Sequence, residues 1–498
     1  MNVNPITRLD YPDPDVIRVE DTYYMVSTTM HFMPGCEILQ SFDLVHWEHA
    51  TYVYETLDHT DAQQLKSGQN IYGQGMWAAS LRYHEGRFYI CFVANDTRKT
   101  YLYTSEKIDG PWKKQLIEGF YHDASLLFDE DGRNYIVYGN DEIWITELNE
   151  DLTAPKKDGL HRLLVSDHKN PELGYEGSHI QKINGYYYIF LIHSLRDRWM
   201  RTEACFYSDS LEGEFTGGDV LCDDRGYCGQ GVAQGGIVDT PDGKWYAMLF
   251  QDSGAVGRIP ILLPVTWKDH FPVFGQNGHV PEEIEVHSTR PGYIYQPLVG
   301  SDDFCNGLLP RWQFNHDPDP RYYHLDALQG TYTITTREVC TELTQAVNTL
   351  TQRMSYPSCA AEVTVDASAL KEGDVAGLCA LQGCYAAVGI TKHHGKYEVL
   401  MLDKKEDGIL DMTEGTVVES HQMDFRLEAD FCNMKDEARC YYRVNKGDWL
   451  PIGTVHKLYF KLDHFTGCRF GLFCYAAEET GGSACFRDFK YYDVDEIS

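Results

Sequence analysis

Short runs rich in Val, Ile, Tyr and Phe, separated by Gly, Asp and Asn, recur along the whole chain, and helical periodicity is scarce. This pattern predicts an all-β protein. One turn-and-strand phrase repeats: EDTYYMV returns as EGRFYIC, DGRNYIV, NGYYYIF and DGKWYAM. Each copy places a tyrosine three residues after the turn residue, at Tyr24, Tyr89, Tyr135, Tyr188 and Tyr246. The spacing is close to, or somewhat above, the length of a four-stranded propeller blade, so five copies predict a five-bladed β-propeller.

A second repeat supports the blades. SFDLVHW, SEKIDGPW and SDSLEGEF have the character of the outer end of successive blades. Independent hairpins of a β-sandwich are the alternative interpretation. After Arg290 the repeat stops, and later runs such as AAEVTVD and KYEVLML alternate between apolar and polar residues. We therefore expect a propeller over residues 1–297 and an antiparallel, concanavalin- or lectin-like β-sandwich over residues 298–498.

The repeat also predicts where a functional site lies. The innermost strand of every blade lines the central channel, so one equivalent residue per blade can face a common axis. Counting back from the turn residues gives Asp13, Trp77, Asp123, Glu176 and Gln234. Three converging carboxylates repel one another, which is hard to explain as stabilisation and easy to explain as pKa tuning. The alternative is that some of these acids only bind backbone amides.

Paired carboxylates are the chemistry of glycosidic bond hydrolysis, in which one acid protonates the leaving oxygen and a second group attacks or activates water. Glu176, with its longer reach, suits the acid. Trp77 offers an aromatic wall for a sugar ring, or a propeller core residue. Arg290 lies just before the domain boundary, where it could reach sugar hydroxyls or form an ordinary interdomain ion pair.

Composition excludes several other classes of function. With 43 Lys and Arg against 75 Asp and Glu, the formal net charge is −32, which repels nucleic acid and anionic membrane surfaces. The first residues lack a signal peptide pattern, and no later stretch has the length of a membrane span. The 15 cysteines are scattered without zinc-site spacing, as expected for reduced thiols. We expect a cytoplasmic protein that acts on a neutral saccharide.

Four phrases resemble the family 43 glycoside hydrolases of the β-xylosidase and α-L-arabinofuranosidase type. They are NPITRLDYPDPDVIRVEDTYYMVST, GMWAASLRYHEGRFYI, HDASLLFDEDGRNYIVYG and YEGSHIQKINGYYYIF, and the resemblance extends over the whole expected propeller. The resemblance implies that Asp13 is the catalytic base, Asp123 a pKa modulator and Glu176 the general acid. It also implies that Arg290 contacts substrate and that the Met30–Phe32 segment, with His31 and Phe32, builds a pocket wall.

Two departures from the family pattern stand out. Asp15 replaces a common serine and is an alternative candidate for the base, because strand alternation turns it the same way as Asp13. Gln234 stands where many relatives have a histidine beside a metal ion or water cluster. We therefore expect no metal and no required cofactor; a structural calcium is the alternative.

The resemblance implies an exo-acting hydrolase that releases a terminal pentose, either β-D-xylose or α-L-arabinofuranose, from hemicellulose-derived oligosaccharides, because family members with this sandwich close one side of the active site into a pocket. Inversion is expected because Asp13 and Glu176 come from blades one and four and face each other across the channel, with room for a water molecule. The alternatives are an endo-acting, arabinanase-like hydrolase and a non-catalytic carbohydrate-binding protein. By resemblance, a homo-oligomer is also expected.

Overall fold

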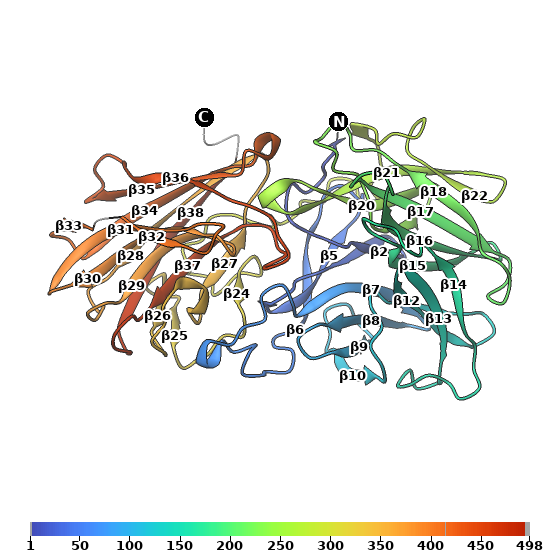
Figure 1. Ribbon diagram of the computed structural model, residues 1–498, viewed down its shortest axis with the longest axis horizontal. Helices are drawn as coiled ribbons and strands as arrows, with labels where there is room; N and C mark the ends of the chain where they lie inside the picture. The colour runs from blue at the N-terminus through green and yellow to red at the C-terminus, as the bar shows by residue number, and fades with distance from the viewer. Residues whose placement is uncertain (1, 414, 494–498) are drawn as a thin grey trace.

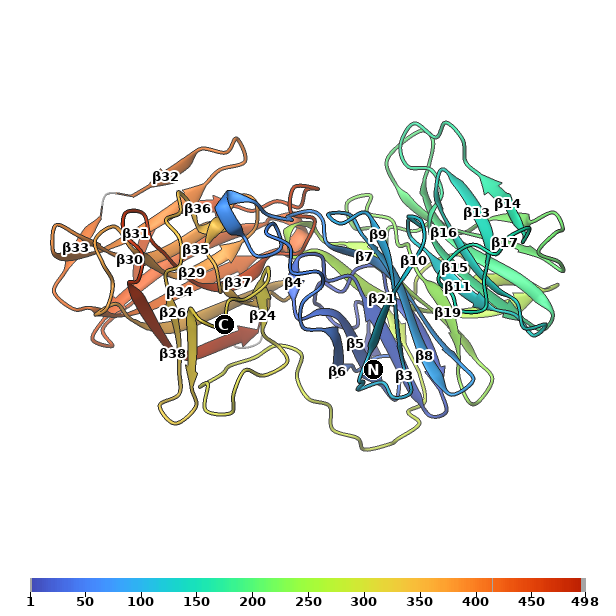
Figure 2. The ribbon, with the colours of Figure 1, turned by 90° about the horizontal axis from the view of Figure 1, so that it is seen from below.

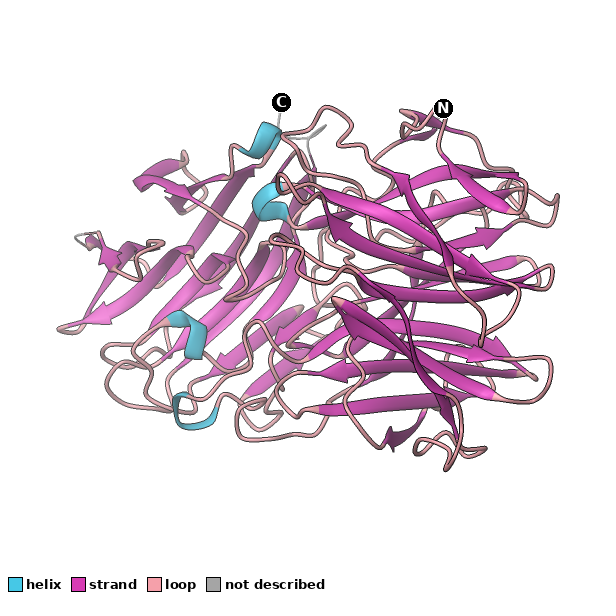
Figure 3. Ribbon diagram, turned by 45° about the vertical axis from the view of Figure 1, so that its right-hand side comes forward, coloured by secondary structure: helices cyan, strands magenta, loops and turns pink. Residues whose placement is uncertain are grey.

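The computed structural model describes residues 2–413 and 415–493, and β-strands account for nearly all of its regular structure. Figure 3 shows strands in both halves of the molecule, with only single-turn helices between them. Those helices are η1 (Lys66–Gly68), η2 (Gly254–Val256), η3 (Leu343–Gln345) and η4 (Cys432–Met434). No helix in the described part of the chain is long and apolar enough to cross a membrane.

Five separate four-stranded antiparallel sheets form the N-terminal half, which lies on the right of Figure 1. Each sheet is built from strands consecutive within this half, apart from the short β4, so every blade forms locally. The inner strands surround a channel. This is the predicted five-bladed propeller. Its strands are β2 (Asp15–Val19), β3 (Thr22–Ser27), β5 (Gly35–Ser41) and β6 (Glu48–Tyr54) in blade 1; β7 (Met76–His84), β8 (Arg87–Ala94), β9 (Lys99–Ser105) and β10 (Lys113–Ile117) in blade 2; β11 (Ser125–Phe128), β12 (Asn134–Asn140), β13 (Glu142–Leu148) and β14 (His161–Ser166) in blade 3; β15 (Glu176–Ile183), β16 (Tyr186–Ser194), β17 (Arg201–Ser208) and β18 (Thr216–Leu221) in blade 4; and β19 (Gly236–Asp239), β20 (Trp245–Asp252), β21 (Arg258–Lys268) and β22 (Phe271–Phe274) in blade 5.

The sequence repeats fall at equivalent places in these blades. All five repeat tyrosines lie on the second strand of their blade, directly after the turn that follows the inner strand. The three serine-led phrases join the third strand to the outermost one. The two registers predicted from the sequence therefore correspond to the inner hairpin and the outer edge of each blade.

The N-terminal segment ties the first blade to the last. β1 (Asn2–Val3) pairs with β23 (Glu283–Ile284), which follows blade 5. The Asn4 amide donates to the Leu262 carbonyl at 2.7 Å and accepts from the Leu262 N–H at 3.0 Å, so it replaces a strand partner at the edge of β21. Such contacts close the ring between its first and last blades.

The C-terminal half is a sandwich of two antiparallel sheets over one apolar core, on the left of Figure 1. One sheet has the order β32-β31-β30-β29-β37-β27-β24-β4, with β33 paired to β31, and the other has the order β25-β26-β38-β28-β34-β35-β36. The strands are β4 (Phe32–Met33), β24 (Gln313–Asn315), β25 (Tyr323–Asp326), β26 (Thr331–Thr335), β27 (Leu350–Arg353), β28 (Ser358–Asp366), β29 (Val375–Leu381), β30 (Ala386–His393), β31 (Lys396–Lys404), β32 (Leu410–Met412), β33 (Thr416–Val418), β34 (Gln422–Asp430), β35 (Glu437–Val444), β36 (Leu450–Lys457), β37 (Arg469–Tyr475) and β38 (Ser483–Asp493).

Strand β4 joins the two halves, because it comes from the propeller sequence yet pairs with β24 of the sandwich. Figure 2, which views the molecule from below, shows β4 between the propeller and the sandwich and the connecting segment running along the propeller. A second link comes from the sandwich. The loop between β36 and β37 reaches the propeller, where the Gly467 N–H donates to Asp10 at 2.8 Å. The sandwich therefore contributes side chains to one end of the propeller channel.

Candidate active site

All five residues predicted to face the axis lie at the same end of their inner strands. Glu176 and Trp77 are the first and second residues of their strands, and the other three lie two residues before theirs. Together they line one cavity of about 230 Å³. The propeller fold therefore brings together Asp13, Trp77, Asp123, Glu176 and Gln234.

Asp13 is held by two side chains. The Thr28 hydroxyl donates to its Oδ2 at 2.6 Å, and Arg258 Nη1 donates to its Oδ1 at 2.9 Å. Its backbone has a φ of +52°, in the left-handed region that few non-glycine residues occupy. Strain of this kind persists where the surrounding structure fixes a functional side chain, and here it aims a carboxylate at the cavity.

Asp123 has the same backbone conformation, with a φ of +48°. Its Oδ2 accepts the Gly177 N–H at 3.1 Å. Gly177 has a φ of +67°, and a Cβ at this position would lie 2.2 Å from Cδ of Gln234. Glycine is therefore required beside Glu176, because two neighbouring blades approach each other too closely for a side chain.

Glu176 is the most accessible carboxylate of the three. Its Oε2 accepts the Asn140 amide at 2.7 Å and lies 3.3 Å from Nε2 of His122. His122 Nε2 is also 3.5 Å from Asp123 Oδ2, so the imidazole lies between the two acids. Both contacts to Glu176 use Oε2, and Oε1 has no hydrogen bond within the described part of the chain.

Burial and the neighbouring charges shift the pKa values of Asp123 and His122. Burial raises the pKa of Asp123 to about 6; His122 opposes this shift, and the negative charges of Glu176 and Asp13 add to it. Burial lowers the pKa of His122, but the three carboxylates outweigh it and raise the pKa to about 9. His122 is therefore an imidazolium at neutral pH.

His122, Asp123 and Glu176 also form a group whose potential ligand atoms lie within 4.8 Å of one another. The hydrogen-bond donors around them do not fit a cation, because the Asn140 and Gly177 N–H groups point at the same oxygens a metal would need. That these residues hold no metal stays a prediction.

Aromatic and apolar side chains from both domains complete the cavity. Trp77 lies 5.9 Å from the His122 ring and 5.6 Å from the Phe465 ring, centroid to centroid. Its indole N–H is buried and has no hydrogen-bond partner among the described residues. Phe465 and Leu462 come from the sandwich loop between β36 and β37, and Met30 comes from the propeller.

The prediction for Arg290 is wrong. Its guanidinium pairs with Asp21 at 2.8 Å and lies 4.1 Å from the centre of the Phe42 ring. Asp21 is in the turn that ends β2, whereas Asp13 precedes that strand, so Arg290 is at the opposite end of blade 1 from the cavity. The long segment after blade 5 returns along the outside of the propeller rather than entering the channel.

The predictions for His31 and Phe32 as pocket walls are also wrong, although their neighbour Met30 does line the cavity. The chain turns outward after Met30 to form β4. The His31 ring is buried against Tyr72, His316 and His464 between the two domains. Phe32 packs beneath the Arg469 guanidinium at 3.4 Å.

Two arginines in the cavity were missed from the sequence. Arg258, the first residue of β21, binds Asp13, and its Nε and Nη2 are buried without partners among the residues described. Arg201, the first residue of β17, forms an ion pair with Asp252 and also lines the cavity. Both lie where a strand begins at the same end of the channel as the carboxylates, so the blade register could have indicated them.

Asp15 does not compete with Asp13. It is fully buried and accepts from Arg82 Nη1 and the Leu81 N–H, both at 2.7 Å, with His179 Nδ1 at 3.0 Å. Burial alone would raise the pKa of Asp15, but Arg82 and His179 outweigh it and hold the pKa below its usual range. Asp15 is an ionised structural group that holds inner strands together.

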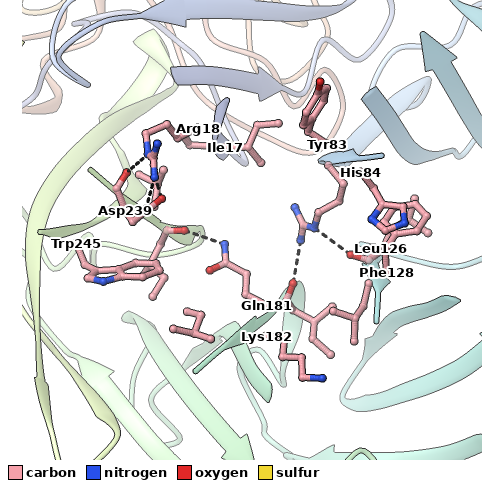
Figure 4. A pocket seen from close by; sticks show the side chains of 17 residues that line it. Ile17, Arg18, Tyr83, His84, Leu126, Phe128, Gln181, Lys182, Asp239 and Trp245 are labelled. Atoms are coloured by element: carbon pink, nitrogen blue, oxygen red, sulfur yellow. Dashed lines mark hydrogen bonds and ion pairs between the residues drawn. The ribbon is translucent and has the colours of Figure 1, made fainter. Parts of the chain in front are cut away.

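A second cavity, of about 410 Å³, occupies the other mouth of the channel (Figure 4). Its polar side chains are already bonded to the protein. Arg18 pairs with Asp239, Gln181 donates to the Ile237 carbonyl at 2.8 Å, and Arg82 donates to the Leu126 carbonyl at 2.9 Å. These contacts connect neighbouring blades. The polar side chains named here are therefore already paired within the protein, unlike the carboxylates that converge on the first cavity.

Comparison with known families agrees with this geometry. The family described as "Glycosyl hydrolases family 43" matches residues 3–272. The chain belongs to glycosyl hydrolase family 43. A second family, described as "Beta xylosidase C-terminal Concanavalin A-like domain", matches residues 301–492. The predicted fold and family are confirmed, and the family implies a carbohydrate substrate.

Individual relatives span the whole chain. A beta-xylosidase of Formosa agariphila is 26% identical over 99% of this chain and 89% of its own. A xylosidase/arabinosidase of Butyrivibrio fibrisolvens is 24% identical, covering 99% of both chains. A solved structure from Bacteroides eggerthii, described as a bifunctional GH43-CE protein, is 42% identical with a TM-score of 0.92 and covers 99% of this chain. This chain spans only 63% of that protein.

Proposed function

We propose that this family 43 glycosidase is an inverting, exo-acting hydrolase that releases terminal pentose units from hemicellulose-derived oligosaccharides. The observation that carries the proposal is the cavity in which Asp13, Asp123 and Glu176 meet beneath a wall of sandwich side chains. A simple sugar-binding site has no need of three carboxylates gathered in one cavity.

Asp13 is the general base in this proposal. The Arg258 guanidinium stabilises its negative charge, and Thr28 fixes its orientation. A water molecule between Asp13 and the anomeric carbon would lose its proton to the carboxylate as it attacks. Because the base activates water instead of attacking carbon, no glycosyl-enzyme intermediate forms.

Glu176 is the general acid. Asn140 and His122 hold its Oε2, which leaves Oε1 to carry the proton to the leaving oxygen. Asp123, buried beside it with a pKa of about 6, sets the charge that Glu176 experiences as the pH changes. The free donors of Arg258 and the Trp77 N–H suit the hydroxyl groups of the terminal sugar.

The size and walls of the cavity support exo action. Its volume of about 230 Å³ suits one sugar ring, and Leu462 and Phe465 add a wall from the second domain. An endo-acting enzyme needs a cleft open at both sides to pass a polymer. The names of the relatives include both β-xylosidase and arabinosidase activity, so they leave both β-D-xylose and α-L-arabinofuranose as candidate sugars. A panel of nitrophenyl glycosides would decide between the two.

The mechanism is tested by proton NMR of the first sugar released, recorded before mutarotation. We expect the anomer opposite to that of the substrate, and monosaccharide as the product from the start of the reaction. Asp13→Asn and Glu176→Gln should each lower kcat about 100- to 10,000-fold, since each removes a general acid or base. Retention of configuration would overturn the mechanism, and a ladder of internal fragments would overturn exo action.

A further inference from the structure

Trp199 is a large aromatic side chain of blade 4, with 44% of its surface exposed. It lies in the loop that joins β16 to β17 in blade 4. The loop is firmly held, because the Leu195 N–H donates to the Met200 carbonyl at 3.1 Å and the Met200 N–H donates to the Ser194 hydroxyl at 2.8 Å. The indole is therefore presented to solvent by an ordered loop.

Arg201 connects this indole to the cavity. Its guanidinium carbon lies 5.5 Å from the centre of the Trp199 ring and 5.3 Å from that of Phe250. Arg201 and Phe250 both line the cavity, so Trp199 is the direct neighbour of a lining residue. The Arg201 Nε is buried and has no hydrogen-bond partner among the described residues. An aromatic and cationic surface thus runs from the cavity to its rim.

The position of the general acid indicates which side of the scissile bond this surface adjoins. The acid must contact the oxygen of the leaving group, so the rest of the leaving sugar lies on the acid's side of the cavity. Glu176 begins β15 of blade 4, and Trp199 and Arg201 come from the β16–β17 connection of the same blade. Blade 4 therefore supplies both the acid and the adjoining surface.

We infer that Trp199 and Arg201 form a binding subsite for the sugar unit on the leaving-group side of the scissile bond. The inference rests on the proposed function. The non-polar C–H face of a pentose ring would lie on the indole, and the Arg201 guanidinium would donate to one of its hydroxyl groups. The ligand class is a neutral oligosaccharide of two or more pentose units.

Two substrates with the same terminal pentose but different leaving groups test the subsite. The disaccharide of that pentose occupies the subsite, whereas the glycosyl fluoride leaves it empty. For Trp199→Ala, we expect the loss of kcat/KM on the disaccharide to exceed the loss on the fluoride by fivefold or more. Trp199→Phe keeps an aromatic face and should recover most of the loss.

Tyr83→Ala is the matched control, because Tyr83 is also 44% exposed but lies at the opposite mouth of the channel (Figure 4). It should leave both activities unchanged. A difference below fivefold between the two losses of Trp199→Ala would overturn the subsite while the proposed function stands. Failure of the wild-type protein to hydrolyse either substrate would overturn the proposed function itself, and the subsite with it.

Discussion

At the scale of single residues, the active site is governed by a histidine placed among carboxylates. His122 contacts both Glu176 and Asp123, and its pKa of about 9 makes it a cation at working pH. The pKa of Asp123, about 6, already includes the lowering effect of that cation. His122 therefore acts as a positioning residue that controls how many protons the cluster holds.

Replacing the cation by a neutral hydrogen-bonding side chain should move the pH profile. In His122→Gln the positive charge is lost, so the pKa of Asp123 rises above about 6 and the cluster protonates at a higher pH. The acidic limb of kcat/KM should shift upward by about one pH unit. The measurement is the pH dependence of kcat/KM on a nitrophenyl pentoside.

His84→Gln provides the control for this shift. His84 stacks on Phe128 at the opposite mouth of the channel, with ring centroids 4.6 Å apart, and contacts none of the three carboxylates. Its acidic limb should coincide with that of the wild type. An acidic limb that stays in place or moves downward in His122→Gln would contradict the role assigned to the imidazolium.

At the scale of elements, local repeats were readable in the sequence and long-range contacts were not. The turn and tyrosine of each blade belong to one hairpin, so a phrase such as DGRNYIV carries its own structural information. The same register placed Asp13, Asp123 and Glu176 at the starts of inner strands. The position of a residue within a blade could therefore be predicted from sequence alone.

The failures involve segments whose partners are far away along the chain. Phe32 lies in β4, which pairs with β24 of the sandwich, and Arg290 follows a segment that leaves the channel. The contribution of Leu462 and Phe465 is equally hidden, since no local pattern indicates that a sandwich loop reaches the propeller. These contacts depend on how two domains dock, which a strand pattern does not encode.

The sandwich loop between β36 and β37 gives the element-scale prediction. Leu462 is 70% exposed, yet it lines the cavity, so we expect substrate to cover its side chain. Leu462→Ala should raise KM about three- to tenfold, because apolar surface buried against the sugar is lost. The value of kcat should stay within about twofold, as expected when binding in the ground and transition states weakens equally.

Leu328→Ala is the matched control for the loop. Leu328 is 94% exposed, in the sandwich turn between β25 and β26, and it does not line the cavity. Steady-state kinetics on the same substrate should show wild-type KM for this variant. An equal KM for Leu462→Ala and wild type would remove the sandwich from substrate binding.

At the scale of the whole molecule, buried charges link the two domains into one structure. Arg353 of β27 forms an ion pair with Glu37 of blade 1 at 2.9 Å and donates to the Asp10 carbonyl at 2.9 Å. Burial alone would raise the pKa of Glu37, but Arg353 and His49 outweigh it and lower the pKa. Glu37 is therefore ionised, fully buried and dependent on a residue from the other domain.

This dependence predicts a large effect from one substitution. Arg353→Met leaves the Glu37 carboxylate buried without its guanidinium, which costs about 3–5 kcal/mol of unfolding free energy. Because the pair spans the interface, we expect the wild-type protein to unfold in one calorimetric transition. In Arg353→Met the transition should move to lower temperature, or separate into a propeller and a sandwich transition.

Arg321→Met is the control for Arg353→Met. It removes an ion pair that lies on the surface of the C-terminal half, so it separates the effect of the buried pair between the domains from the effect of losing any ion pair. Arg321 also pairs with an aspartate, Asp319 at 2.7 Å, but its side chain is 74% exposed and both residues lie in the C-terminal half. Removing the exposed Arg321 side chain opens Asp319 to water on that side and leaves Arg337 Nη1 3.6 Å from its carboxylate, whereas water cannot reach Glu37 without opening the interface. The Tm of Arg321→Met should therefore match the wild type. Equal Tm values for the two variants, or two separate transitions in the wild type, would show that the domains fold independently and that the active-site wall rests on a weak contact.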